Sequence, residues 1–294
     1  MDREPILARR LFDRIEPVHA VTYFAPEARS ELDGLGYRGF WMGYFAARSA
    51  PFGVVPAEVV TAAFYNFAPH RVAKALPAAW DIAAPDEALQ ARQRSAVAAL
   101  RRYGVTDDGA ADAADLAAKA AAHSDIGGRP VYAANRSLGW PDEPLARLWH
   151  AATLLREHRG DGHVAVLTAE GVSGRECNVL HAAAGRVPEE MIKRSRDYDD
   201  EQWESHREAL ERRGLLDAAG ELTPSGRALK QHIEDSTDAL ALPTLDVLDD
   251  SEVETLFRAL TPITRLTVAG GDIPAGSPMG LSRDDLEDDS SQLV

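Results

Sequence analysis

The second half of the chain spaces its apolar and polar positions as amphipathic helices do. GRECNVLHAAAG has a helical apolar repeat that ends at Gly185, and VPEEMIKRS follows as a short helix. DYDDEQWESHREALERRG predicts a third helix, capped by Asp197 or Asp199 and closed by Gly214. LLDAAGELT predicts a β-hairpin, and PSGRALKQHIEDSTDAL predicts a long helix after it. This order is that of a winged helix-turn-helix domain.

The first half repeats short motifs of the second half in the same order. VHAVT at residues 18–22 matches WHAAT at residues 149–153. Further pairs are GVVPAEVV with GVSGRECN, NFAPHRVAKAL with GRVPEEMIKRS, and ALRRYG with ALERRG. Each match is weak alone, but the shared order predicts an internal duplication. We therefore expect a first winged-helix repeat over residues 1–136, a second over residues 137–280, and an acidic disordered tail over residues 281–294.

Two resemblances extend this prediction. ALERRGLLDAAGELTPSGRALKQHIEDSTDAL resembles the recognition helix and wing of MarR-type regulators. The blocks EPVHAVTYFAPEA, APFGVVPAEVVTAAFYNFAPHRVAKALPAAW and REHRGDGHVA resemble an actinobacterial helix-turn-helix family of duplicated winged helices. MarR-type proteins are homodimers with intertwined terminal helices, so the resemblance implies the same arrangement within one chain. The predicted fold class is mainly α, a tandem duplicated winged helix forming an intramolecular pseudo-dimer.

Composition and charge narrow the classes of partner. The 294 residues carry a formal net charge of −15, which disfavours binding to a phosphate backbone. Cys177 is the one cysteine, so one chain has no disulfide and no cysteine-based zinc site. The charged start MDREPILARR is not a signal peptide, and no apolar run is long enough to span a bilayer. We therefore expect a cytoplasmic protein without a membrane partner.

The segments that would touch DNA are acidic. The candidate recognition helix of the second repeat begins Asp199-Asp200-Glu201, and that of the first begins Pro85-Asp86-Glu87. The candidate wing of the first repeat, YGVTDDGAAD, carries Asp107 and Asp108 in place of arginine. Acidic residues also favour helix N-termini for electrostatic reasons alone. DNA binding is therefore disfavoured and not excluded.

Three of the nine histidines fall in LWHAATLLREHRGDGH. We expect a helix from Pro144 to about His158, after which Gly160-Asp161-Gly162 turns the chain. A pseudo-twofold axis would bring His19 of the first repeat towards His150 of the second. Such imidazoles suit a ligand, acid–base chemistry or a metal, but they equally suit packing and helix capping. No metal-ligand spacing such as HExxH is present, so no metal site is predicted and the cofactor is unknown.

Aromatic residues gather in the first repeat, in GFWMGYFAARSAPFG and TAAFYNFAPHR. They predict either an aromatic core or an apolar pocket, in which Arg38 and Arg48 would hold an anionic group. The second repeat has small residues instead, which favours one specialised pocket. The candidate ligand-binding residues are His19, Tyr23, Trp41, Tyr44, Arg48, His150, His158 and His163.

The leading hypothesis is a protein that binds a small molecule, aromatic or anionic, in a histidine-lined pocket near the pseudo-twofold axis. Its DNA-binding surface is degenerate on this interpretation, and whether it catalyses a reaction stays open. The alternative is an effector-responsive, DNA-binding regulator of MarR type. A third interpretation is an adaptor for other proteins, which predicts neither a cavity nor a basic face.

Overall fold

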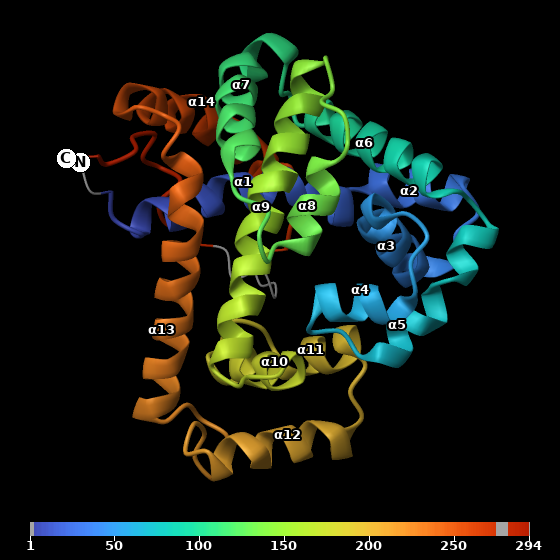
Figure 1. Ribbon diagram of the computed structural model, residues 1–294, viewed down its shortest axis with the longest axis vertical. Helices are drawn as coiled ribbons and strands as arrows, with labels where there is room; N and C mark the ends of the chain where they lie inside the picture. Colours follow the sequence, from blue (N-terminus) through green and yellow to red (C-terminus); the bar gives the residue numbers. More distant parts are fainter. Residues whose placement is uncertain (1–2, 275–281, 294) are drawn as a thin grey trace.

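The computed structural model describes residues 3–274 and 282–293. Over these ranges the chain forms α-helices joined by short turns and 3₁₀ helices (Figure 1). No strand forms in the described part of the chain, where one antiparallel β-bridge pairs Leu216 with Leu222. The predicted mainly α class is therefore confirmed.

The first half of the chain builds eight short to medium helices. They are α1 (Ile6–Phe24), α2 (Pro26–Gly34), α3 (Gly39–Ser49), α4 (Ala57–Phe64), α5 (Pro69–Ala75), α6 (Pro85–Arg102), α7 (Asp107–His123) and α8 (Pro130–Arg136), with 3₁₀ helices η1 (Ala50–Phe52) and η2 (Ala78–Asp81). Proline opens α2, α5, α6 and α8, where its missing N–H has no helical partner to lose. Proline therefore marks where four of these helices begin.

The second half has fewer and longer helices. They are α9 (Pro144–Ala169), α10 (Gly174–Ala183), α11 (Glu189–Arg196), α12 (Asp200–Arg212), α13 (Pro224–Ala241) and α14 (Asp250–Ala269), with η3 (Leu242–Leu245). Side chains of Ser173, Asp199, Thr223 and Asp249 accept backbone N–H groups at the starts of α10, α12, α13 and α14. The predicted helices from α10 to α13 and the predicted cap at Asp199 are confirmed.

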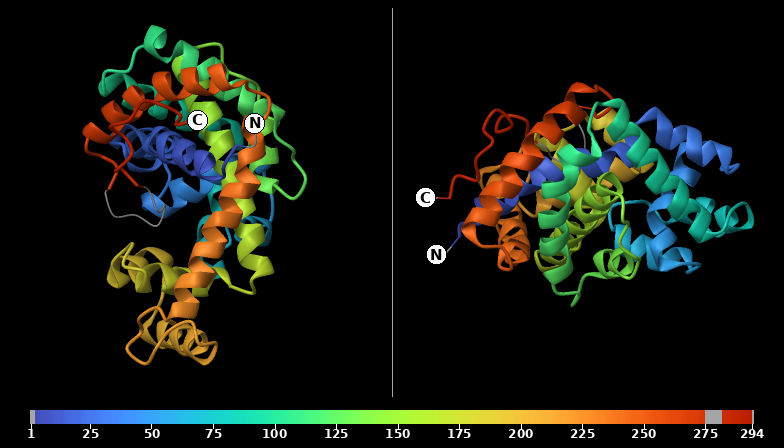
Figure 2. Two further views of the ribbon diagram at one scale, coloured as in Figure 1. Left: turned by 90° about the vertical axis from the view of Figure 1, so that its left-hand side faces the viewer. Right: turned by 90° about the horizontal axis from the view of Figure 1, so that it is seen from above.

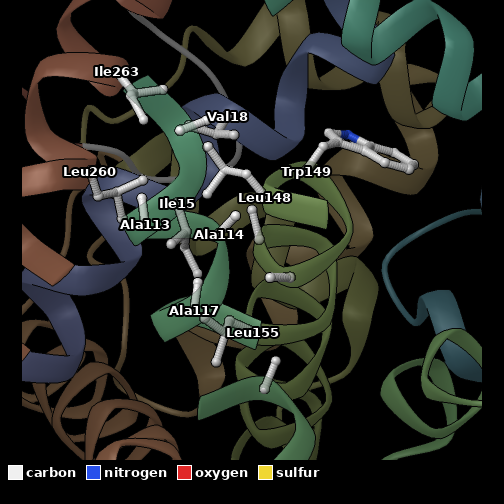
Figure 3. Close-up of a cluster of buried hydrophobic side chains, with 14 of the residues drawn as sticks. Ile15, Val18, Ala113, Ala114, Ala117, Leu148, Trp149, Leu155, Leu260 and Ile263 are labelled. Atoms are coloured by element: carbon white, nitrogen blue, oxygen red, sulfur yellow. The ribbon is translucent and has the colours of Figure 1, made fainter. Parts of the chain in front are cut away.

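The main hydrophobic core lies where α9 packs against α1 and α7 (Figure 3). Leu148 and Leu155 of α9 meet Ile15 and Val18 of α1. The facing side of α7 is lined by alanines that are at most 1% exposed: Ala110, Ala113, Ala114, Ala117, Ala120 and Ala121. Such small side chains let helix backbones approach closely, so this seam leaves little room for rearrangement.

Two smaller cores flank the main one. One is aromatic and joins α3, α4 and α5 around Phe45 and Phe64. The other joins the end of α9 to α10, α11, α12 and α13 around Ile192 and Leu210. Figures 1 and 2 show α9 and α13 running side by side from the main bundle down to this second unit. The two long helices therefore connect the unit that carries α12 to the rest of the molecule.

Helix α9 corrects the prediction that the chain turns at Gly160-Asp161-Gly162. The helix continues unbroken to Ala169. Tertiary contacts stabilise it there, since Asp161 accepts the backbone N–H of Tyr132 and Arg129 donates to the carbonyl of His158. A Cβ at position 162 would lie 2.7 Å from Arg129 Nη1, so a larger residue there would require the end of the Arg129 side chain to shift. Packing thus overrides the weak helix propensity of two glycines.

The two candidate wings differ from each other. In the second half, the Leu216–Leu222 bridge reduces the predicted hairpin to one bridge pair. In the first half, the predicted wing is absent, because Thr106 caps α7 and the helix begins at Asp107. The acidic pair Asp107-Asp108 occupies the first turn of α7, which the helix dipole favours.

The acidic C-terminal segment is packed where residues 282–293 are described, although the sequence predicts disorder. Asp285 Oδ2 lies 2.6 Å from Arg10 Nε and 2.9 Å from Arg14 Nη1. Ser291 donates to Glu254, and Leu286 is buried. Arginines on α1 supply the opposite charge. The prediction of disorder rests on the composition of the segment alone and does not include such distant partners. Residues 281 and 294 lie outside the described residues.

Candidate functional site

A cavity of about 410 Å³ lies between the two halves of the chain. Its walls come from α1, α3, the turn between α4 and α5, α9, α10 and α11. This volume falls in the range of natural sites for small molecules, which are usually apolar with a few placed polar groups. The cavity is therefore the candidate functional site of the described residues.

The polar run of α9 forms one wall of the cavity. Of the eight residues in REHRGDGH, six line it: Arg156, Glu157, Arg159, Gly160, Asp161 and His163. At Gly160, an added Cβ would meet only Glu157 Oε2 within 4 Å, at 3.7 Å. The missing side chain therefore leaves this part of the wall open. The sequence predicts a helix end at this charged run. In the structure the run lies in the middle of α9, and its charged side chains face the cavity.

A buried ion-pair network crosses this wall. Glu157 Oε2 lies 2.8 Å from Arg156 Nη1 and 3.2 Å from Arg48 Nη2. Arg156 Nε also lies 3.1 Å from Glu16, whose side chain is fully buried. Burial alone raises the pKa of a carboxyl, but Arg156 and Arg48 hold the pKa of Glu157 well below its ordinary range. Glu157 is therefore an anion that fixes two arginines at the cavity.

The two other buried carboxyl groups of the wall behave differently. Burial raises the pKa of Glu16, which shares Arg156 with Glu157. Burial raises the pKa of Asp161 to about 7, although the backbone N–H of Tyr132 opposes the shift. Burial thus disfavours the charged form of both carboxyl groups.

The opposite wall is aromatic and comes from α3 and the α4–α5 turn. The ring of Tyr44 lies 5.6 Å from both Trp41 and Phe67, and 5.1 Å from Tyr23 of α1. Arg48 donates to the hydroxyl of Tyr44 at 3.1 Å, which joins this wall to the ion-pair network. Edge-on and tilted rings at these distances form a stable apolar surface. The wall can contact a flat apolar ligand.

Arg196, the last residue of α11, differs from the other arginines of the cavity. Its guanidinium lies over the ring of Phe67, 4.3 Å from the centroid. The Nε atom is buried without a hydrogen-bond partner among the described residues. Burial lowers the pKa of Arg196, and the nearby Arg48 and Arg71 act in the same direction. The cavity thus contains an arginine that forms no ion pair with a carboxylate of the described residues.

Five of the eight candidate residues line this cavity, and three do not. Those in the lining are Tyr23, Trp41, Tyr44, Arg48 and His163; those outside it are His19, His150 and His158. His19 lies behind the lining, where Nδ1 donates to Thr153 at 2.9 Å and Nε2 accepts from Tyr23. The hydrogen bond between His19 and Thr153 joins the VHAVT and WHAAT motifs directly.

The remaining histidines have packing positions. His150 packs edge-on against Trp140, and His158 against Tyr132. Burial lowers the pKa of His150 to about 4 and that of His158 to about 3. His163 lines the cavity and lies 3.0 Å from Thr237 Oγ1 through Nδ1, and burial lowers its pKa to about 4. All three are therefore neutral imidazoles near pH 7.

Sequence reasoning did not select Glu16, Arg156, Phe67 or Arg196 as site residues. Glu16 and Arg156 could have been found, since Glu16 precedes His19 by one helical turn and Arg156 follows Thr153 by one helical turn, next to the repeated motifs. Arg196 gives no such signal, because its lack of a partner depends on which residues surround it in space.

The surfaces expected to meet DNA are acidic or covered. Helix α12 carries five carboxylates and two arginines, and both arginines pair with glutamates of the same helix. Helix α6 is packed against α1, α2, α3 and α9. Its arginines all bond within the fold: Arg92, Arg94, Arg101 and Arg102. Neither helix offers free cations to phosphates.

The α4–α5 turn and the start of α10 contact each other beside the cavity. The Tyr65 hydroxyl donates to the carbonyl of Val172 at 2.7 Å, and Asn178 donates to that of Asn66 at 3.0 Å. Gly174 makes this approach possible, because a Cβ there would overlap the carbonyl group of Tyr65. Direct contacts between the first and second halves therefore border the cavity.

Two structural searches of the described residues bear on other classes of function. No three His, Cys, Asp or Glu side chains of these ranges lie together as a metal ion would require. None of their helices is long and apolar enough to cross a bilayer.

Comparison with known proteins identifies one family. The model of a family described as a helix-turn-helix family matches residues 8–274, which is nearly the whole chain. No curated protein and no solved structure matches significantly.

Proposed function

The chain belongs to this helix-turn-helix family, and we propose that it is a member that binds a small molecule between its two halves. The observation that carries the proposal is the cavity of about 410 Å³, with an aromatic wall facing a buried ion-pair wall. A purely structural core of this kind would be filled by side chains at close to crystal packing density. An open cavity lined by apolar side chains, with a few fixed polar groups, is instead the usual form of a site for a small molecule.

We further propose that the two halves are copies of one MarR-like winged-helix unit, arranged as an intramolecular pseudo-dimer. The contact of His19 with Thr153 supports this, because each residue belongs to one copy of the repeated motif. The pairing of α1 with α9, which would be equivalent helices, also supports it. The copies differ where the cavity lies, since the first supplies the aromatic wall and the second supplies most of the charges.

Binding can be tested with N-phenyl-1-naphthylamine, a neutral fluorophore that brightens in apolar sites. We expect saturable binding of one probe per chain. Gly160→Leu places a side chain in the open part of the α9 wall and should abolish binding. Ala165→Leu adds the same side chain at an exposed position of the same helix and should leave binding unchanged. Equal binding by both variants, or no saturable binding by the wild type, would contradict the proposal.

A second candidate function is that of an effector-responsive regulator that binds DNA, and the family match itself favours it. The acidic α12 and the covered α6 count against it in this arrangement. Fluorescence anisotropy with a pool of genomic DNA fragments at low salt separates the two. We expect no binding that saturates below the micromolar range. Tight binding whose affinity falls steeply with salt would favour the regulator.

A further inference from the structure

We propose that the cavity selects ligands that carry one negative charge on an apolar, ring-containing body, and that Arg196 is the residue that binds the charge. This inference rests on the proposed function, and it adds the chemical class of the ligand. The supporting observation is an imbalance among the charged groups that line the cavity.

Four of the five arginines in the lining are already neutralised. Arg9 and Arg159 pair with Glu234 and Asp238, and Arg48 and Arg156 pair with Glu157. Arg156 also contacts Glu16. These arginines have their acceptors within the protein, so they hold the wall in place and leave little charge for a ligand.

Arg196 has no ion pair and no side-chain hydrogen bond to a described residue, and its Nε is buried. Leaving the buried Nε of a guanidinium without an acceptor is unfavourable, and natural structures usually supply a partner. The wall offers none, because Glu157 is committed to two other arginines and Asp161 accepts the backbone N–H of Tyr132. An anionic ligand would supply the missing acceptor and balance the charge.

The position of Arg196 also defines the rest of the ligand. Its guanidinium lies on Phe67, and the same ring lies 5.9 Å from Trp41 and 5.6 Å from Tyr44. An anion that accepts hydrogen bonds from Arg196 therefore has its attached body beside the aromatic wall. Flat rings gain the most from such a wall, through offset and edge-on contacts.

Two probes with the same ring skeleton test this selectivity. 8-Anilinonaphthalene-1-sulfonate carries a sulfonate, and N-phenyl-1-naphthylamine is its neutral counterpart. We expect the wild type to bind the sulfonate more tightly. Arg196→Met should weaken sulfonate binding by about 10- to 100-fold and leave the neutral probe nearly unchanged, since one charge-assisted interaction is lost. Arg196→Lys, which keeps the charge, should retain part of the preference.

Arg194→Met is the matched control, because Arg194 is an exposed residue of α11 outside the cavity lining. It removes one positive charge from the same helix and should change neither affinity. An unchanged sulfonate affinity in Arg196→Met, or an equal loss for both probes, would overturn the inference. If the wild type binds the neutral probe at the cavity and not the sulfonate, this inference fails and the proposed function stands. If it binds neither probe, both fail.

Discussion

The buried network around Glu157 allows a quantitative prediction. Glu157→Gln keeps the shape of the side chain but removes the charge between Arg48 and Arg156, at a position that is 2% exposed. At 3.2 Å and an effective dielectric constant of about 20, one such ion pair is worth about 5 kcal/mol before desolvation is subtracted. Because the substitution leaves two arginines with only Glu16 nearby, we expect the free energy of unfolding to fall by about 3 to 5 kcal/mol.

Glu16→Gln is the matched comparison. Glu16 is equally buried and contacts the same Arg156, but burial raises its pKa and Glu157 would still contact both arginines. Its substitution should therefore cost less than that of Glu157. Urea unfolding at pH 7, followed by circular dichroism, gives the free energy of unfolding of both variants. The double variant Arg48→Met with Glu157→Gln, compared with its two single variants, measures the coupling between Arg48 and Glu157. A loss under about 1 kcal/mol for Glu157→Gln, or strict additivity with Arg48→Met, would refute the view that the pair acts as one unit.

Four further predictions concern two glycines, two histidines and Asp161. Gly160→Ala should raise the free energy of unfolding by up to about 1 kcal/mol, because alanine favours a helix interior, and should weaken binding of the neutral probe. Gly174→Ala should lower the free energy of unfolding by about 1 to 3 kcal/mol and speed proteolysis, because its Cβ must displace the backbone at Tyr65. The pKa values of His150 and His158 fall from 6.5 to about 4 and 3 on folding, so below pH 6.5 the unfolded chain binds protons that the folded chain does not. Stability should therefore fall as the pH is lowered from 6.5 to 4, by about 1.4 kcal/mol per pH unit for each histidine, and His150→Gln should reduce this slope. Asp161, with a pKa raised to about 7, acts in the opposite direction, so urea unfolding of Asp161→Asn across the same pH range should show a steeper loss.

Local patterns in the second half predicted its helices well. The cap at Asp199, the closing Gly214 and the proline at the start of α13 are short-range signals, and the structure keeps all three roles. The length of α9 was not predictable in the same way. Gly160 and Gly162 favour a turn locally, and the contacts that keep them helical come from Arg129 and Tyr132, which precede them by about thirty residues.

The candidate site was predictable only in part. Aromatic clustering and the charge on Arg48 pointed to residues that do line the cavity. Histidine content pointed equally to His150 and His158, which pack against rings elsewhere. The property that sets Arg196 apart is a missing partner, and this follows from three-dimensional surroundings that no local pattern contains. The same reason explains the C-terminal segment, whose acidic residues meet Arg10 and Arg14 of α1.

The continuity of α9 has a mechanical consequence. With 26 residues, the helix is about 39 Å long, and its first half is clamped by the alanine seam of α7. Its second half carries the cavity wall and then enters the core of the unit that holds α12. Since α9 has no break at which the chain could pivot, that unit behaves as the far end of a stiff lever. A small tilt forced on the helix beside Gly160 grows in proportion to the distance from the clamp, so the outermost unit moves furthest.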